Sequence, residues 1–236
     1  MLVLDKVKKS YHSHQVLQDL SANFQRGKSY LILGENGAGK STLFKCIAGD
    51  EKISAGSITT NENSPIADVI ALQYQFFDSY PFLKIREVIT LFKKILKVPS
   101  DVDELYDILD IAQFDQTLMK NTSGGQRKAL SLYIAFLLNK PIVLLDEPFA
   151  DLDLKKKKQL ISYLRNEVDK GKCLLMISHE IAGFEMLFDV VCVMKDGQFT
   201  EIDSIEALQE KYANSIFPGL EGIYFEITGQ LLGGKK

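Results

Sequence analysis

Short runs of consecutive apolar residues recur along this chain and alternate with segments in which apolar residues follow helical spacing. The runs occupy positions 30–33, 69–72, 142–145, 174–177 and 190–194. Strands that are apolar on both faces are typical of a parallel sheet covered by helices on both sides. The pattern therefore predicts an α/β fold built around such a sheet.

The segment 85–138 interrupts this alternation. It contains no convincing strand, and its apolar residues recur at helical spacing. These residues are Val88, Leu91, Phe92, Ile95, Leu105, Ile108 and Leu109. The stretch Ser100-Asp101-Val102-Asp103 has the composition of a helix start, with a capping hydroxyl and acids in the first turn. We interpret the segment as a helical insertion into the α/β core.

Composition narrows the possible partners and the compartment. Of the 236 residues, 46% are hydrophobic and 25% charged, and the net charge is -3. This charge gives no electrostatic reason to expect a nucleic-acid partner. No apolar run is long enough to span a bilayer, and the start Met1-Leu2-Val3-Leu4-Asp5 lacks a secretory signal. We therefore expect a cytoplasmic protein whose widely spaced Cys46, Cys173 and Cys192 are reduced and mostly buried.

The clearest chemical signal is Gly34-Glu35-Asn36-Gly37-Ala38-Gly39-Lys40-Ser41, between a predicted strand and a predicted helix. This is a complete P-loop pattern. Its glycines allow the backbone to wrap around phosphates, and the following helix presents its positive N-terminus to the same anion. We expect Lys40 to reach the β- and γ-phosphates and Ser41 to offer its hydroxyl to Mg²⁺. This context favours a nucleotide site over a chance glycine-rich turn.

Two adjacent carboxylates, Asp146 and Glu147, follow the apolar run 142–145. Ligands of α/β sheets bind at the carboxyl ends of the strands, where these side chains are expected to lie. We expect Asp146 to bind Mg²⁺ through water and Glu147 to orient or deprotonate the attacking water. A surface Asp-Glu pair is the alternative, and the accompanying P-loop argues against it.

A second turn, Thr122-Ser123-Gly124-Gly125-Gln126, precedes a helical run. Such a turn provides another helix N-terminus suited to an anion, and it could serve a nucleotide bound to a partner chain. Taken by itself, the pentapeptide is better interpreted as a flexible capping turn.

The order of P-loop, Ser-Gly-Gly-Gln turn and apolar strand with Asp-Glu-Pro resembles the ATP-binding-cassette (ABC) ATPases over nearly the whole chain. The resemblance implies a single domain over 1–236. It would contain a P-loop NTPase core of RecA type with a mostly parallel sheet and an N-terminal antiparallel β subdomain, formed by 1–84 and 139–236. An α-helical subdomain would occupy 85–138. Thr122 stands where the family usually has leucine, so no subfamily follows from this turn.

The resemblance also implies roles for individual residues. Tyr11 corresponds to the aromatic that stacks on adenine, although a half-buried strand tyrosine is the alternative. Gln75 corresponds to the glutamine that contacts Mg²⁺ and the water; Gln73 is the competing register, and the spacing to Pro81 favours Gln75. His179 corresponds to the histidine that contacts the γ-phosphate.

Together these expectations define the candidate site. The catalytic set is Glu147, His179, Gln75 and Lys40, and the metal set is Ser41, Gln75 and Asp146. The ATP-binding set is Tyr11, Gly34, Asn36, Gly37, Ala38, Gly39, Lys40, Ser41, Thr42, Ser123, Gly124, Gly125 and Gln126.

The family resemblance further implies ATP and Mg²⁺ as cofactors and a dimer, of this chain or with a related subunit, closing around two nucleotides. It implies a separate integral membrane subunit, with this chain peripheral on the inner face of the cell membrane. The aromatics Phe76, Phe77, Tyr80 and Phe82 could dock that subunit or belong to the core. Residues 220–229 are similar to the tail of multidrug-type exporter ATPases, which suggests export.

Two other function classes compete with the transporter reading. One is a non-transport cassette ATPase, such as that of iron–sulfur cluster assembly, which would share every motif. The other is a P-loop kinase or GTPase. A kinase or GTPase should lack the Ser-Gly-Gly-Gln turn, and the guanine-reading Asn-Lys-x-Asp motif of GTPases is absent from the sequence.

Overall fold

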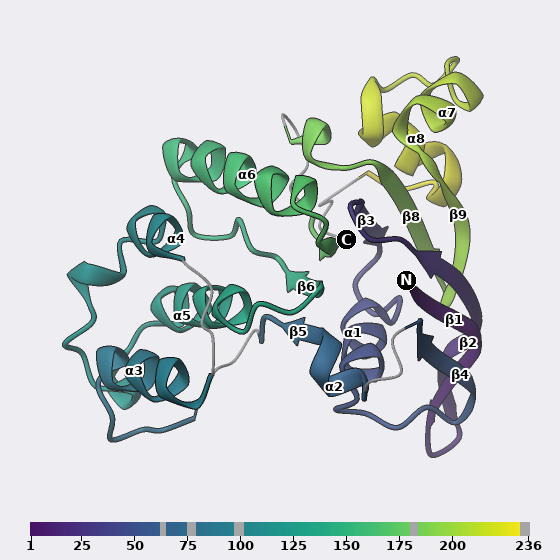
Figure 1. The fold of residues 1–236 in the computed structure, drawn as a ribbon. Helices are drawn as coiled ribbons and strands as arrows, with labels where there is room; N and C mark the ends of the chain where they lie inside the picture. The colour runs from purple at the N-terminus through teal and green to yellow at the C-terminus, as the bar shows by residue number, and fades with distance from the viewer. Residues whose placement is uncertain (62–64, 75–78, 97–101, 180–183, 232–236) are drawn as a thin grey trace.

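Two β-sheets organise the chain (Figure 1). The computed structural model describes residues 1–61, 65–74, 79–96, 102–179 and 184–231. An antiparallel sheet has the order β2-β1-β4, and a six-stranded sheet has the order β5-β6-β7-β3-β8-β9. In the larger sheet every neighbouring pair is parallel except β8 and β9. This arrangement confirms the predicted α/β class, the mostly parallel sheet and the antiparallel N-terminal part.

The strands alternate with helices along the chain. The strands are β1 (Leu2–Tyr11), β2 (His14–Phe24), β3 (Ser29–Gly34), β4 (Ala55–Thr60), β5 (Ile70–Leu72), β6 (Ile142–Asp146), β7 (Cys173–Ile177), β8 (Val190–Lys195) and β9 (Gln198–Ser204). The α-helices are α1 (Lys40–Ala48), α2 (Ile66–Val69), α3 (Ile85–Ile95), α4 (Asp103–Ile108), α5 (Gly124–Leu137), α6 (Leu154–Asp169), α7 (Ile205–Lys211) and α8 (Gly219–Thr228). Short 3₁₀ turns are η1 (Ile111–Gln113), η2 (Met119–Asn121) and η3 (Glu185–Leu187).

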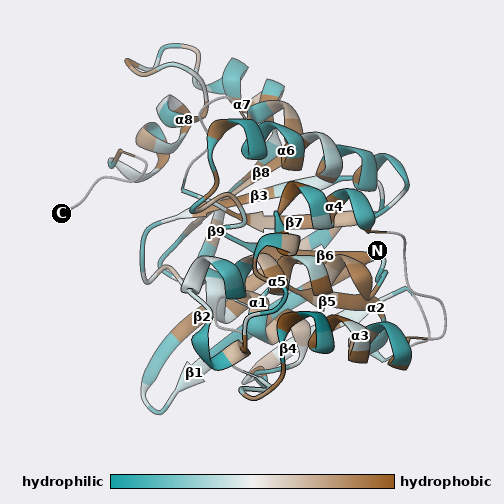
Figure 2. Ribbon diagram, turned by 90° about the vertical axis from the view of Figure 1, so that its left-hand side faces the viewer, coloured by the Kyte–Doolittle hydropathy of each residue, from teal (hydrophilic) through white to brown (hydrophobic). Residues whose placement is uncertain are grey.

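The larger sheet separates two hydrophobic cores, because alternate residues of each strand face opposite sides. On one side, Ile32 and Leu144 pack with α1 and the antiparallel sheet. On the other side, Leu31 and Val143 pack with α4, α5, α6 and α8. The central strands of the larger sheet are largely brown in Figure 2, whereas the covering helices show teal outer faces. Strands β3, β6 and β7 are buried along their whole length. Both faces of the sheet are thus covered, as the all-apolar runs predicted.

The sheet brings the chemistry-bearing turns to one edge. In the parallel register Asp146 lies opposite Ile177, Ile32 also lies opposite Ile177, and Gly34 lies opposite Met194. The carboxyl ends of β3, β6 and β7 therefore meet at the same edge, where α/β sheets hold ligands.

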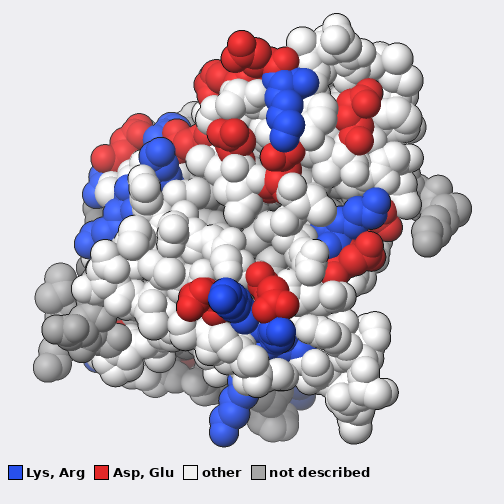
Figure 3. All heavy atoms as spheres, turned by 90° about the vertical axis from the view of Figure 1, so that its right-hand side faces the viewer, with Lys and Arg blue, Asp and Glu red and all other residues white. Residues whose placement is uncertain are grey.

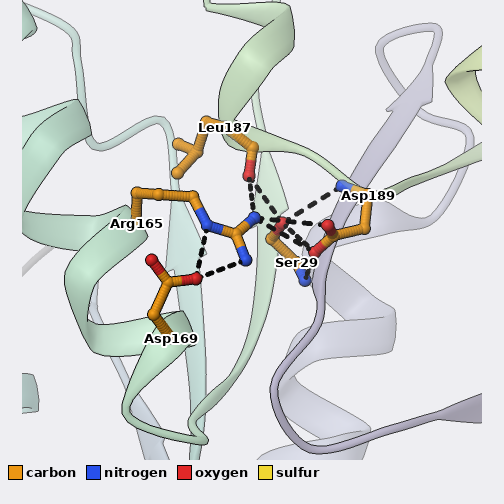
Figure 4. Close-up of polar contacts among 5 residues, drawn as sticks. All are labelled: Ser29, Arg165, Asp169, Leu187 and Asp189. Carbon is orange, nitrogen blue, oxygen red and sulfur yellow. Dashed lines mark hydrogen bonds and ion pairs between the residues drawn. The ribbon is translucent and has the colours of Figure 1, made fainter.

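A polar cluster joins four elements at the opposite edge (Figure 4). The N–H and hydroxyl of Ser29 each donate to Asp189 Oδ2 at 2.8 Å, and the Ser29 hydroxyl also donates to the Leu187 carbonyl. Arg165 of α6 lies between Asp169 and Asp189, with N···O distances of 2.8 and 3.3 Å. These contacts fix the starts of β3 and β8 against the end of α6.

Most predicted elements are confirmed, with two differences. The five predicted strands correspond to β3, β5, β6, β7 and β8, and the three cysteines are free and buried. Helix α4 begins at Asp103, but Val102 occupies its N-cap position without a side-chain cap, so the predicted hydroxyl cap is wrong; Ser100 and Asp101 lie outside the described residues. Strand β9 was not predicted, because its alternation is half exposed and weakly apolar.

Candidate functional site

The P-loop connects β3 to α1 and is shaped by close backbone approaches. Gly37 and Gly39 have φ angles of 87° and 99°, which favour glycine. A Cβ at Gly39 would lie 2.9 Å from Leu17 Cδ2 and 3.0 Å from the Val16 carbonyl oxygen. Gly39 is the N-cap of α1, no side chain caps this end, and its first turn carries no acid. The N–H groups at this helix start can therefore bind an anion.

Lys40 is held close to this loop. Its Nζ donates to the carbonyl oxygens of Gly34 at 2.6 Å and Glu35 at 2.9 Å. Burial lowers the pKa of Lys40, while the nearby carboxylates of Glu147 and Asp146 act in the opposite sense. The ammonium thus lies within the loop beside the acidic strand end, where a phosphate would bring further compensating charge.

Ser41 and Asp146 meet across the mouth of the loop. The Ser41 hydroxyl donates to Asp146 Oδ2 at 3.1 Å, and Asp146 is buried. A hydroxyl and a carboxylate are hard oxygen ligands of the kind that Mg²⁺ prefers. No group of three or more His, Cys, Asp or Glu side chains suited to a metal occurs in the described parts of the chain. The pair therefore fits an ion that also takes phosphate oxygens and water, as Mg²⁺ does in nucleotide sites.

Glu147 adopts an uncommon backbone conformation, with φ at 52°. Its N–H donates to the Ile177 carbonyl at 2.9 Å, and its Oε2 accepts from the His179 N–H at 3.3 Å. Its Oε1 is buried, and no described residue donates a hydrogen bond to it. Burial raises the pKa of Glu147. A strained, desolvated carboxylate with a free acceptor is suited to holding or deprotonating a water.

His179 completes this side of the site. Its Nε2 lies 3.6 Å from Glu147 Oε1, too far for a hydrogen bond. Burial, followed by the positive charge of Lys40, lowers the pKa of His179. The imidazole is therefore neutral at pH 7 and forms no ion pair with Glu147.

These groups line one pocket of about 550 Å³, within the range of small-molecule sites. Its lining consists of Val16, Asn36, Gly37, Gly39, Lys40, Ser41, Thr42, Asp146, Glu147, Ile177 and His179. Gly34 and Ala38 shape the loop without lining the pocket. Val16 and Ile177 were missed by the sequence analysis, because apolar strand residues carry no signal of a site.

Among the described residues, the expected contributor Tyr11 does not line the pocket. Tyr11 is 39% exposed and lies at the end of β1. Gln75 lies outside the described residues, as do Phe76 and Phe77. The competing Gln73 is 1% exposed, and no described residue pairs with its side-chain amide.

The Ser-Gly-Gly-Gln turn forms a different site. Ser123 is the N-cap of α5, where its Oγ accepts from the Gln126 N–H at 3.2 Å and Gln126 Oε1 accepts from the Ser123 N–H at 3.0 Å. A groove of about 290 Å³ beside it is lined by Leu109, Phe114, Ser123, Gly125, Gln126, Lys128, Ala129, Leu132, Pro148, Ala150, Asp151, Leu152 and Lys156. Among the described residues, this groove shares none with the P-loop pocket. The P-loop and the Ser-Gly-Gly-Gln turn therefore border separate hollows.

Comparisons with known proteins agree with this geometry. A family model described as ABC transporter matches residues 17–150. The sn-glycerol-3-phosphate import ATP-binding protein UgpC of Ruegeria pomeroyi is 28% identical, over 94% of this chain and 66% of that protein. The trehalose import ATP-binding protein SugC of Mycobacterium tuberculosis is 30% identical, over 94% of this chain and 59% of that protein. This chain thus spans about two thirds or less of these relatives.

A solved structure extends the likeness to the fold. The dimeric ATP-binding cassette MJ0796, in a post-hydrolysis state bound to ADP and Pi, matches with a TM-score of 0.73 and 21% identity, over 86% of this chain and 98% of that one. Both curated relatives are named as import proteins. They give no support to the export direction expected from residues 220–229, which form most of α8, and that expectation is withdrawn.

Proposed function

This chain belongs to the ABC transporter family and carries its ATPase domain, and from that premise we propose that two copies close around two Mg·ATP to drive transport through a separate membrane subunit. The proposal depends on one observation, which is that the P-loop and the Ser123 turn border two separate hollows. The P-loop pocket and the groove at Ser123 have no described lining residue in common, which favours each turn of one chain acting on a different nucleotide. In a two-fold dimer each pocket would face the partner's turn.

Within one pocket the residues divide the work. The N–H groups at the start of α1 and the Lys40 ammonium would bind the β- and γ-phosphates. Ser41 and Asp146 would hold Mg²⁺, which neutralises charge between the phosphates when bound. Glu147, with its raised pKa and free Oε1, would orient and deprotonate the attacking water. The neutral His179 would donate a hydrogen bond toward the γ-phosphate. Gln75 is proposed as a further contact to the metal and water.

Closure would couple chemistry to movement. Ser123, Gly125 and Gln126 of one copy would contact the γ-phosphate in the pocket of the other, so ATP would stabilise the closed dimer and its hydrolysis would release it. A ligand can do mechanical work only through such differential affinity for two states. The space around Gly124 is open, since a Cβ there would meet nothing within 4 Å, and this leaves the turn accessible to a partner.

The membrane subunit is proposed to dock beside the segment that carries Gln75. Exposed aromatic side chains flank that segment: Tyr74 and Tyr80 are partly exposed, and Phe82 is 76% exposed with Lys120 Nζ 5.2 Å from its ring centroid. Exposed aromatics are typical of interaction sites. No helix in the described ranges is long and apolar enough to cross a bilayer. We accordingly place the chain on the inner face of the cell membrane, bound to its partner.

A complementation experiment tests the divided site. Lys40→Met disables the P-loop pocket, and Gly125→Glu places a carboxylate where a phosphate should bind. Each variant alone is expected to be inactive. An equal mixture should recover up to about a quarter of wild-type ATPase activity, because half of the dimers are mixed and each mixed dimer has one intact composite site. A mixture that stays as inactive as the separate variants would refute the composite site.

A further inference from the structure

The buried ammonium of Lys9 has no role in the site described so far. Lys9 is 7% exposed and lies in β1. Its Nζ donates to Glu51 Oε2 and to the Lys52 carbonyl oxygen, both at 2.8 Å. Both acceptors follow α1 in the sequence, so these bonds tie the β1–β2 hairpin to the chain beyond the P-loop helix. A lysine is seldom this buried unless its charge is paired.

The same ammonium lies over the ring of Tyr11. The distance from Lys9 Nζ to the ring centroid is 4.5 Å, which is cation–π range. Lys9 and Tyr11 are two residues apart on one strand and therefore share a face. Tyr11 is the last residue of β1 and pairs with His14 across a tight turn in which His12 has a φ of 54°. The ring is thus at an exposed hairpin end, where its contacts include the Lys9 ammonium on one face and a side-chain hydrogen bond with Glu51.

This hairpin end adjoins the nucleotide pocket. Val16 of β2 lines the pocket, and Leu17, the strand partner of Lys9, approaches Gly39 of the P-loop. The hairpin is therefore packed against the loop that would hold the phosphates. Because Lys9 covers one face of the Tyr11 ring, only the opposite face can accept a base.

We propose that Lys9 is a positioning residue for the nucleotide base: its ammonium holds the Tyr11 ring against one face so that adenine stacks on the other. This inference rests on the proposed function and on the expectation from the sequence that Tyr11 contacts the base. The contact has two consequences. A ring that is already fixed loses less conformational entropy when the base binds. A cation on one face of the ring also draws electron density toward itself, so the opposite face that stacks on the base becomes more positive. Stacking discriminates little between bases, so Lys9 should contribute equally to the affinities for ATP and GTP.

Isothermal titration with a non-hydrolysable ATP analogue, its GTP counterpart and inorganic tripolyphosphate separates base binding from phosphate binding. Lys9→Met keeps the aliphatic stem and removes the charge. It should raise the Kd of both nucleotides about two-fold to five-fold, the size of a partly exposed cation–π contact, and leave the tripolyphosphate Kd unchanged. Lys8→Met is the matched control, because Lys8 is half-exposed, on the other face of β1, and paired with Asp19 at 3.1 Å; it should change none of the three.

A double-mutant cycle with Tyr11→Ala makes the test specific, since only coupled residues deviate from additivity. In the Tyr11→Ala background, Lys9→Met should have no further effect on nucleotide affinity. An equal loss with and without the ring, or an equal loss for tripolyphosphate, would overturn the proposal. Lys9→Arg, which keeps a cation able to stack on the ring, should restore wild-type affinity.

Folding defects and failure of the underlying function give different results. If Lys9→Met does not fold, Lys9→Gln keeps a donor for Glu51 and the Lys52 carbonyl oxygen but removes the charge. It should raise the nucleotide Kd without changing the tripolyphosphate Kd; equal changes in both would overturn the proposal. If the wild type binds tripolyphosphate and Tyr11→Ala does not weaken nucleotide binding, the base contact alone is refuted. Wild type that bound neither ligand would refute the proposed function itself.

Discussion

Replacing Gly34 with alanine should destabilise the protein and displace its P-loop together, because this glycine is where β3 passes closest to β8. A Cβ at this position would lie 2.4 Å from the Met194 carbonyl oxygen and 3.3 Å from its carbonyl carbon. Both neighbours are backbone atoms of a buried central strand, so no side chain can rotate away. An ordinary contact begins near 3.4 Å, so the two strands must separate by about 1 Å (3.4 - 2.4).

The size of the effect follows from that overlap. Overpacking a well-packed core costs about 1 to 3 kcal/mol or more, and a backbone–backbone clash belongs at the upper end. For a domain of this length about 3 kcal/mol corresponds to a Tm lower by roughly 6 to 12 °C. A shift of about 1 Å in a catalytic loop can also lower turnover by on the order of a hundred-fold.

Scanning calorimetry and ATPase assays check both effects, with Gly124→Ala as a control for Tm alone, because Gly124 lies in the turn proposed to face the partner's nucleotide. A Cβ at Gly124 meets nothing within 4 Å, and Gly124 begins helix α5. Alanine there should leave Tm unchanged or slightly higher. If Gly34→Ala melted within about 2 °C of wild type and hydrolysed ATP normally, the close approach of β3 and β8 would not constrain the loop, and the reasoning would be wrong.

Four further predictions follow from the geometry. Glu147→Gln should lower turnover by about 10² to 10⁴ while ATP still binds, and turnover at the wild-type rate would exclude the general-base role. Because burial raises the pKa of Glu147, the acid limb of the kcat/KM profile should lie above the ordinary value of about 4.3, and any residual activity of Glu147→Gln should lack that limb. Asp189→Asn should lower the free energy of unfolding by about 1 kcal/mol at pH 7, a figure that allows for the screening of this partly exposed charge by solvent. Burial opposes the charge of Asp189, but Ser29 and Arg165 lower its pKa, so this stability is present above the unfolded pKa of about 3.9 and is lost as pH falls through the lower folded pKa; the denaturant midpoints of variant and wild type should converge in acid. Gln73→Met should stabilise the protein by about 1 kcal/mol, because an unpaired buried amide is removed, and should leave ATPase activity intact; a large loss of activity would show that Gln73 belongs to the site.

The sequence predicted the central strands well because their apolar runs are short, continuous and bounded. The antiparallel strands carried a weaker signal, since each has one covered and one exposed face. Strand β9 alternates only partly buried residues with exposed ones, and its place beside β8 depends on the register of a strand that precedes it. On the face that carries β1, β2 and β9, basic and acidic side chains are interspersed without a broad area of one sign (Figure 3). Because charges of both signs are mixed on this face, the amino-acid composition does not indicate how the face is built.

Residue types with obligatory chemistry were predictable; residues that act through position were not. The P-loop pattern required Gly39, Lys40 and Ser41, and the structure brings all three into one pocket with Glu147. Nothing in the local sequence indicated that Glu147 would have a positive φ, since this conformation arises from its hydrogen bond to Ile177, 30 residues later in the chain (177 - 147). Long-range packing, which no local pattern encodes, produces the strain.

The hairpin of β1 and β2 illustrates the same limit and explains how distant parts of the site are connected. A side chain at Gly39 would collide with Leu17 and the Val16 carbonyl oxygen, so the hairpin and the phosphate loop can pack this closely only because position 39 is a glycine. Lys9 fastens the same hairpin to the chain just beyond α1. Helix α1 is thus held at its start by contact with Leu17 and just beyond its end by Glu51. A nucleotide whose phosphates bind at the start of α1 and whose base contacts Tyr11 would therefore lie against both attachments of the hairpin.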